Sequence, residues 1–178
     1  MSKKIAILRG INVGGKRKIL MADLKKLCEN LAFKHVKTYI QSGNIIFNSD
    51  EPIPVLAKNL EEAIQAQFGF DVPVIIITQN ELETTINNNP FIGKDAAMNQ
   101  LHVTFLKEEP TNTAITKALT YNYPPDEFKI TGKTVFIFCA DKYHKSKLSN
   151  NFFEKQLAIK ATTRNWKTVM KLLEISKA

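Results

Sequence analysis

The order of apolar and amphipathic segments constrains the fold of this chain more than any other feature. The first part predicts strands at 4–9, 36–41, 45–47 and 72–78, with helices at 21–31 and 54–68. Leucines recur every three or four residues in the first helix, and Gly43 supplies a turn between the two adjacent strands. This β-α-β-β-α-β order is that of a ferredoxin-like, or split βαβ, unit.

A related order recurs after residue 100, although no residue-level repeat accompanies it. The expected elements are strands at 101–106, 128–130 and 134–138, and helices at 112–121, 148–157 and 164–175. A helix thus replaces the final strand of the first unit. We expect an α+β protein of two ferredoxin-like units with mainly antiparallel sheets, namely 1–78 and 101–178. Residues 79–100 form a connecting helix and loop, which begins at a Thr78–Glu81 capping box.

Several function classes lack support in the composition. No apolar run approaches the roughly 20 residues of a membrane span, and no secretion signal is evident, so we expect a cytoplasmic protein without membrane partners. Cys28 and Cys139 resemble small buried apolar residues, although the sequence does not decide whether a single disulfide joins them. The three histidines are dispersed without ligand spacing, so we expect no metal, and no cofactor is indicated. No nucleophile and base can be paired from the sequence, which leaves enzymatic activity open.

Charge is distributed unevenly along the chain. The net charge is +8 overall, with +8 in residues 1–49, −6 in 50–140 and +6 in 141–178. If the two basic ends meet in space, they form one positive surface that suits an anionic partner. The alternative is that these lysines only solvate helix faces.

A glycine-rich basic loop, Gly10 to Lys18, follows the first predicted strand. It matches the G-x-x-x-x-G-K part of a P-loop, but Arg17 stands where Ser or Thr would hold magnesium, and the antiparallel order lacks the parallel sheet of P-loop enzymes. A weaker interpretation remains. Backbone N–H groups at Gly14 and Gly15, with Lys16 and Arg9, suit a bound anion such as phosphate. A merely polar connection is the alternative.

Two further motifs carry candidate binding residues. In Thr38–Asn44, strand alternation places Tyr39 and Gln41 on the sheet face away from Thr38, but the next strand lacks an RNA-binding aromatic motif. In Ala161–Trp166, a threonine is expected to cap the last helix, which places Arg164 in its first turn. A cation there opposes the helix dipole, so an acid such as Glu154 or a ligand anion should compensate it.

These motifs resemble a bacterial family known as domain of unknown function 1697. The resemblance rests on LRGINVGGK, TYIQSGNIIF, NPF and NNFFEKQLAIKATTRNWKTVMKLL, and it spans essentially the whole chain. It implies two ferredoxin-like units and little about activity. Lys167 replaces an asparagine expected after the tryptophan of this family pattern.

The leading functional hypothesis is a non-enzymatic binder of nucleic acid or a phosphorylated ligand. The alternatives are an enzyme acting on a phosphorylated or carboxylated small molecule and a homo-oligomeric interaction module. We further expect the two basic ends to form one site. The candidate anion-binding residues are Arg9, Asn12, Gly14, Gly15, Lys16, Gln41, Arg164 and Asn165.

Overall fold

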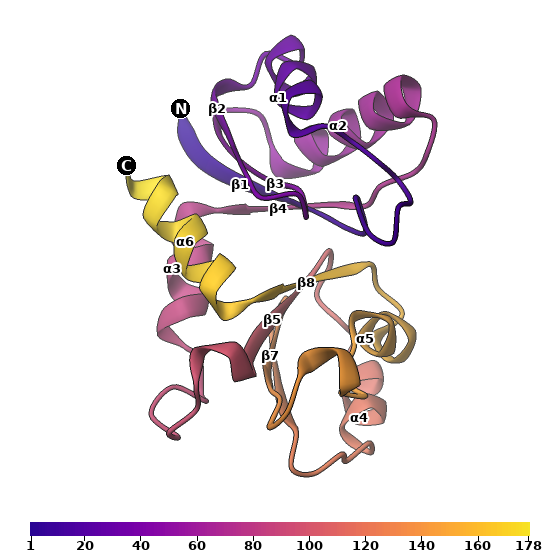
Figure 1. The fold of residues 1–178 in the computed structure, drawn as a ribbon, viewed down its shortest axis with the longest axis vertical. Helices are drawn as coiled ribbons and strands as arrows, with labels where there is room; N and C mark the ends of the chain where they lie inside the picture. Colours follow the sequence, from indigo (N-terminus) through magenta and orange to yellow (C-terminus); the bar gives the residue numbers. More distant parts are fainter. The chain divides into compact units, whose positions relative to one another are not determined.

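The computed structural model describes residues 1–178 and divides the chain into two compact units. Unit 1 comprises Met1–Glu83 together with Lys171–Ala178, and unit 2 comprises Thr84–Met170. Each unit contains a four-stranded antiparallel sheet with helices (Figure 1), which confirms the expected α+β class with two similar units. None of the helices has the length and apolar content that a bilayer crossing requires.

Unit 1 has the predicted element order, with a sheet order of β2-β3-β1-β4. Both helices lie on one face of this sheet (Figure 1). The central strand β1 pairs antiparallel with β3 and β4, so its apolar residues are buried on both sides. The elements are β1 (Ser2–Leu8), α1 (Met21–Asn30), β2 (Lys34–Tyr39), β3 (Asn44–Ser49), α2 (Ile53–Phe68) and β4 (Val74–Thr78).

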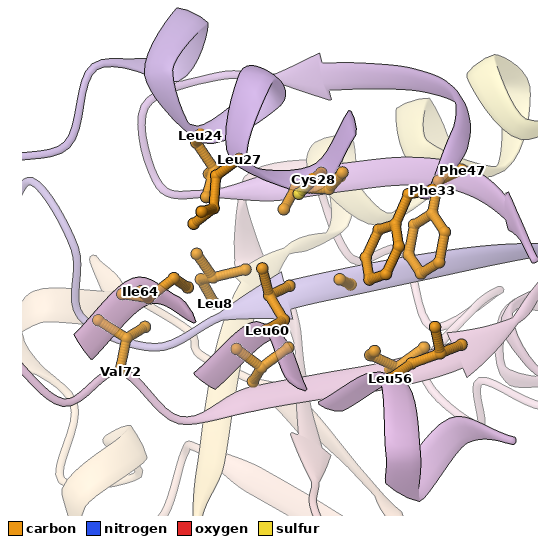
Figure 2. Close-up of a cluster of buried hydrophobic side chains, with 14 of the residues drawn as sticks. Leu8, Leu24, Leu27, Cys28, Phe33, Phe47, Leu56, Leu60, Ile64 and Val72 are labelled. Carbon is orange, nitrogen blue, oxygen red and sulfur yellow. The ribbon is translucent and has the colours of Figure 1, made fainter. Parts of the chain in front are cut away.

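The core between this sheet and its two helices is mainly aliphatic (Figure 2). The predicted helical period is confirmed, because Leu24 and Leu27 of α1 are buried there. One aromatic pair, Phe33 and Phe47, stacks with ring centroids 4.2 Å apart. Cys28 is fully buried and free, and burial raises the pKa of its thiol to about 12. This cysteine is therefore a packing residue rather than a nucleophile.

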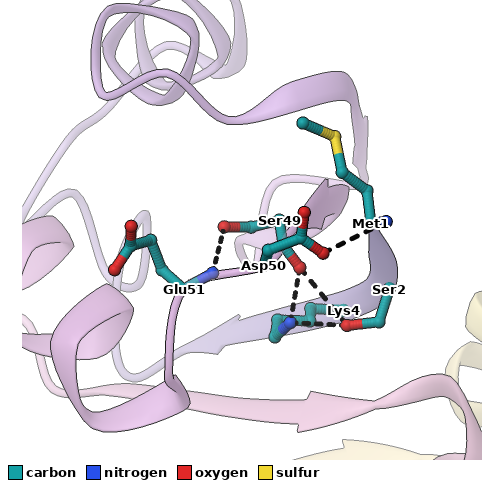
Figure 3. Close-up of polar contacts among 6 residues, drawn as sticks. All are labelled: Met1, Ser2, Lys4, Ser49, Asp50 and Glu51. Carbon is teal, nitrogen blue, oxygen red and sulfur yellow. Dashed lines mark hydrogen bonds and ion pairs between the residues drawn. The ribbon is translucent and has the colours of Figure 1, made fainter.

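A buried lysine lies at the end of β1 (Figure 3). The Lys4 ammonium donates to the Ser2 hydroxyl and to the Ser49 carbonyl, each at 2.7 Å, and its side chain is only 5% exposed. The Met1 ammonium forms an ion pair with Asp50 at 3.1 Å. Since a buried ammonium is costly without partners, these acceptors stabilise the pairing of β1 with β3 at this end.

The connection between the units begins as predicted. Glu81 N–H donates to the Thr78 hydroxyl at 3.1 Å, and Thr78 N–H donates to the Glu81 carboxylate at 2.7 Å. This capping box starts α3 (Gln79–Asn87), and a short 3₁₀ turn, η1 (Met98–Gln100), precedes the next strand. The boundary between the two units falls within α3 and again within α6 (Trp166–Lys177).

Unit 2 has the same strand arrangement as unit 1, in the order β6-β7-β5-β8. Figure 1 shows α4 and α5 on one side of its sheet. The predicted hairpin is confirmed, since β6 and β7 pair around Gly132. The elements are β5 (Leu101–Leu106), α4 (Asn112–Leu119), β6 (Glu127–Thr131), β7 (Thr134–Phe138), η2 (Tyr143–Lys145), α5 (Asn150–Leu157) and β8 (Ala161–Asn165).

The prediction that a helix replaces the last strand of unit 2 was wrong. Residues 161–165 form β8, which pairs antiparallel with β5 along its whole length. Its sequence, Ala-Thr-Thr-Arg-Asn, lacks an apolar alternation, so its identity as a strand comes from pairing with β5 rather than from its own pattern.

This strand also changes the expected start of the last helix. Asn165, and not Thr162 or Thr163, provides the cap, because its side-chain oxygen accepts a hydrogen bond from Thr168 N–H at 2.8 Å. The buried face of α6 carries Trp166, Val169 and Leu172, whereas Met170 is 40% exposed.

The core of unit 2 is more aromatic than that of unit 1. Phe153 is fully buried, with Phe128 and Phe152 arranged edge-on around it at centroid distances of 5.2 and 5.0 Å. Cys139 is buried and free, so the two cysteines form no disulfide. Burial also raises the pKa of the Cys139 thiol, as expected for a packing residue.

Candidate functional site

The basic loop, defined here as residues 9–18, folds as a short hairpin. Asn12 N–H donates to the Arg17 carbonyl at 3.1 Å, and Lys16 N–H donates to the Val13 carbonyl at 3.0 Å. Gly14 and Gly15 form the turn with φ of 58° and 74°, the combination of a two-residue hairpin turn that glycine favours. The amides used inside the loop are therefore those of Asn12 and Lys16, and not those of Gly14 and Gly15 that were expected to face an anion.

This geometry is not that of a P-loop. The strand before the loop belongs to an antiparallel sheet, and the loop closes on itself before the following helix begins at Met21. Neither Gly14 nor Gly15 would meet another atom within 4 Å if it carried a Cβ. The two glycines thus serve the backbone conformation of the turn and not a close approach of other atoms.

The Asn12 side chain holds the basic loop in place. Its amide nitrogen donates to the carbonyls of Ile19 and Gln41, at 3.0 and 2.8 Å, and its amide oxygen accepts from Ile19 N–H at 2.9 Å. These three bonds connect the start of the loop, its end and the β2–β3 turn. Asn12 is therefore a positioning residue whose polar atoms are engaged, rather than a group directed at a ligand.

Gly43 fixes the β2–β3 turn against the same loop. A Cβ at this position would lie 2.6 Å from Cδ1 of Ile11 and 3.0 Å from Cβ of Leu8, and its φ is +88°. The Gly43 carbonyl accepts a hydrogen bond from Leu8 N–H at 2.9 Å. Both conformation and space thus require glycine where the two loops meet.

A pocket of about 340 Å³ lies where the basic loop meets the β2–β3 turn. This volume lies within the range of small-molecule sites, about 300–1,000 Å³. Of the predicted site residues, Asn12, Gly15 and Gln41 line it. The other lining residues are Lys18, Ile19 and Leu20. The wall therefore combines one ammonium group and one exposed side-chain amide with an apolar surface.

The electrostatics of this region favour an anion. The basic loop contains Arg9, Lys16, Arg17 and Lys18 and no acid. The side chains of Lys16 and Lys18 are exposed, and neither forms a salt bridge. In addition, α1 has Leu20 at its N-cap with no side-chain cap, so its first N–H groups lack the usual acceptor.

Asp23 lies in the first turn of α1 and offsets part of this positive field. The lysines, rather than the helix end, must therefore supply most of the attraction for an anion.

The remaining part of the hairpin motif is structural. Asn44 is fully buried, and its amide nitrogen donates to the Tyr39 carbonyl at 2.9 Å and to the Ser42 hydroxyl at 3.1 Å. Ile40 has φ of 50°, so the chain turns before Gln41. Gln41 is exposed and is the side chain of this motif that lines the pocket.

Arg164 and Asn165 belong to unit 2 and differ from their predicted setting. Arg164 lies on β8 and not in a helix first turn, so the predicted conflict with a helix dipole does not arise. It is 8% exposed, and its guanidinium donates to the Thr162 hydroxyl at 2.8 Å and to the Thr163 carbonyl at 3.0 Å. Burial lowers its pKa to about 10. Its participation in one site with the basic loop stays a prediction.

Sequence reasoning missed a second polar region in unit 2. The His102 ring stacks on Tyr143 with centroids 4.3 Å apart, and its buried Nδ1 has no hydrogen-bond partner. Burial lowers the pKa of His102 to about 4. Tyr143 also lines a pocket of about 460 Å³ with Gln100 and Asp141. No sequence signal connects these residues, because β5 and η2 are far apart along the chain.

Comparison with known proteins identifies a family model and a similar solved structure. A family model described as protein of unknown function (DUF1697) matches residues 1–136. This range contains the basic loop and the first hairpin, whereas the C-terminal motif lies beyond it. No functionally curated protein matches the chain.

A solved structure supports the same relationship over nearly the whole length. The conserved bacterial protein SP0830 from Streptococcus pneumoniae is 26% identical to this chain, with a TM-score of 0.76. The match covers 98% of each chain. The family model spans more than half of the sequence, and the likeness in fold includes both units. The chain therefore belongs to the family of proteins of unknown function named DUF1697.

Proposed function

We propose that unit 1 binds a small phosphorylated ligand in the pocket beside the basic loop. The main observation is the position of this pocket, which is lined by Gln41 of the β2–β3 turn and by Lys18 of the basic loop, a loop with four cations and no acid. The phosphate lies against Lys16 and Lys18, and the Gln41 amide provides a directional hydrogen bond. Ile19 and Leu20 contact the apolar part of the ligand.

Preorganisation supports this function. The three hydrogen bonds of Asn12 and the close packing of Gly43 on Ile11 hold the loop and the turn in one arrangement before any ligand binds. Binding then costs less conformational entropy than it would for a flexible loop.

A thermal-shift experiment on the full chain tests the proposal. The probes are AMP, glucose 6-phosphate and inorganic phosphate, with adenosine as the uncharged control. A ligand at 100 times its Kd adds about 2.7 kcal/mol to stability. We expect at least one phosphorylated probe to raise the melting temperature while adenosine does not.

Two variants test whether the rise in melting temperature comes from binding at the basic loop. The double variant Lys16→Gln, Lys18→Gln should abolish the shift, because it removes Lys18, which lines the pocket, and Lys16, the other exposed lysine of the basic loop. Lys58→Gln is the matched control, since Lys58 is an exposed lysine of unit 1 on α2. No stabilisation by any phosphorylated probe, or an equal shift in the double variant, would contradict the proposal.

Exposed apolar side chains favour self-association as a second candidate function. Val13, Leu20 and Ile40 are 65%, 70% and 45% exposed, and all three belong to the basic loop, its end or the neighbouring turn. Light scattering over a concentration series tests this candidate. A mass that doubles with concentration, and returns to one chain in Leu20→Gln, would support it; a constant single-chain mass would exclude it.

A further inference from the structure

Unit 2 carries a cluster of partly exposed aromatic rings, called here the aromatic patch and comprising Tyr121, Tyr123, Phe128 and Phe152. Phe152 is at its centre, with its ring edge-on to Tyr121 at 5.3 Å, Tyr123 at 5.8 Å and Phe128 at 6.4 Å. The two tyrosine rings lie 6.2 Å apart. Three different segments thus bring four rings together at the border of the unit 2 core.

The rings come from positions that the fold holds fixed. Phe128 is on β6, and Phe152 is on α5, whose N-cap Ser149 accepts a hydrogen bond from Phe152 N–H at 3.2 Å. Tyr121 N–H donates to the Ala118 carbonyl at 3.1 Å directly after α4. The patch is therefore anchored on a strand and two helix ends rather than on a free loop.

One lysine contacts this patch, and two others lie near its residues in the sequence. The Lys147 ammonium lies 5.4 Å from the centre of the Tyr123 ring, within cation–π range. Lys117 precedes Tyr121 by four residues on α4, and Lys155 follows Phe152 by three on α5; both are exposed.

Acids also lie close by in the sequence, since Asp126 and Glu127 precede Phe128 and Glu154 follows Phe152 by two residues. The Asp126 and Glu154 carboxylates accept hydrogen bonds inside the fold, and Glu127 pairs with Lys94 at 3.5 Å.

We infer that the aromatic patch is a binding surface for single-stranded nucleic acid. Partly exposed rings beside a lysine provide the two interactions that such a ligand needs. Unpaired bases stack on the rings, and the ammonium group neutralises phosphate charge. A duplex offers only its phosphates, because its bases are already stacked and paired. This site lies wholly in unit 2 and does not depend on the phosphorylated ligand proposed for unit 1.

Fluorescence anisotropy with a labelled oligothymidine and with a duplex of equal length tests this inference on the full chain. We expect the single strand to bind more tightly than the duplex at low salt. We expect Tyr121→Leu, Tyr123→Leu to weaken single-strand binding about tenfold or more, since each base stack contributes substantially. Lys147→Gln should flatten the log–log salt dependence by about 0.7, the value for one phosphate contact on a single strand.

Two controls separate this surface from others. Lys58→Gln changes an exposed lysine of unit 1 that belongs to neither proposed site, so it should leave oligonucleotide affinity unchanged within about twofold. Lys147→Gln changes an exposed side chain and keeps the test valid if the tyrosine variant does not fold. Equal affinity for duplex and single strand, unchanged affinity in folded patch variants, or no binding at low salt would overturn the inference.

Discussion

Units 1 and 2 have the same strand arrangement but reach it with different side chains. The last strand of unit 1, β4, reads Val-Ile-Ile-Ile-Thr, whereas its counterpart β8 reads Ala-Thr-Thr-Arg-Asn. The helix-covered core of unit 1 is aliphatic with one stacked ring pair, and that of unit 2 contains several edge-on rings. A polar segment such as β8 can therefore form an edge strand when it pairs antiparallel with an apolar central strand such as β5.

The two equivalent hairpin glycines offer the largest expected contrast. Gly43→Ala should destabilise the chain by about 2–4 kcal/mol, because the methyl group would meet Ile11 at 2.6 Å in a left-handed backbone conformation. Gly132→Ala should cost only about 1 kcal/mol, since φ is +56° but no atom lies within 4 Å. Urea unfolding measures both. Equal losses in the free energy of unfolding would contradict the close packing of Gly43 against Ile11.

A buried histidine should make the stability of unit 2 sensitive to acid. The pKa of His102 is 6.5 in the unfolded chain and about 4 in the fold, because burial disfavours the charged ring. Between these values the unfolded state binds more protons, so stability should fall by about 1.4 kcal/mol per pH unit as the pH decreases from 6.5 to 4.

The variant His102→Phe keeps a ring beside Tyr143 but cannot take up a proton. Its free energy of unfolding should therefore fall less than that of the wild type over this pH range. His144→Gln, which changes an exposed histidine, is the control and should follow the wild type. If the difference between His102→Phe and the wild type does not change with pH, then His102 does not control acid sensitivity.

The smallest contrast concerns the helix caps. Asn165→Ala should cost about 1 kcal/mol, because it removes the acceptor for Thr168 N–H at the start of α6. Asn165→Asp should retain most of the stability, since aspartate caps helices equally well. Thermal unfolding compares the two variants. A similar loss in both would mean that the amide group of Asn165 has another role.

Sequence patterns predicted the elements whose residues carry their own signal. The leucine period of α1, the glycine-centred hairpins and the Thr78–Glu81 capping box all reflect local physics, and the structure confirms each. β8 was missed because its stability comes from β5, which lies about 60 residues earlier in the chain and is found only by pairing. The same error misplaced Arg164 in a helix and the cap of α6 at a threonine.

The candidate site was predictable only in part, for a similar reason. The charge and glycine content of the basic loop marked it in the sequence, and Gln41 was named from strand alternation. However, the Asn12 side chain forms hydrogen bonds with the backbone of Ile19 and Gln41. The bond to Gln41 joins the loop to a turn almost 30 residues away, and no local sequence pattern predicts it. The pocket walls formed by Ile19 and Leu20 became identifiable only once that contact was known.

The most direct test of a phosphate site in unit 1 is a titration of the ¹⁵N-labelled chain with AMP, monitored by amide ¹H–¹⁵N correlation spectra. We expect saturable shifts at Gly14, Gly15, Lys18 and Gln41, with the amides of β5–β7 in unit 2 unchanged. The same titration of Lys16→Gln, Lys18→Gln should show little change at these positions. Saturable shifts confined to unit 2, or none at the basic loop at any AMP concentration, would contradict a phosphate site in unit 1.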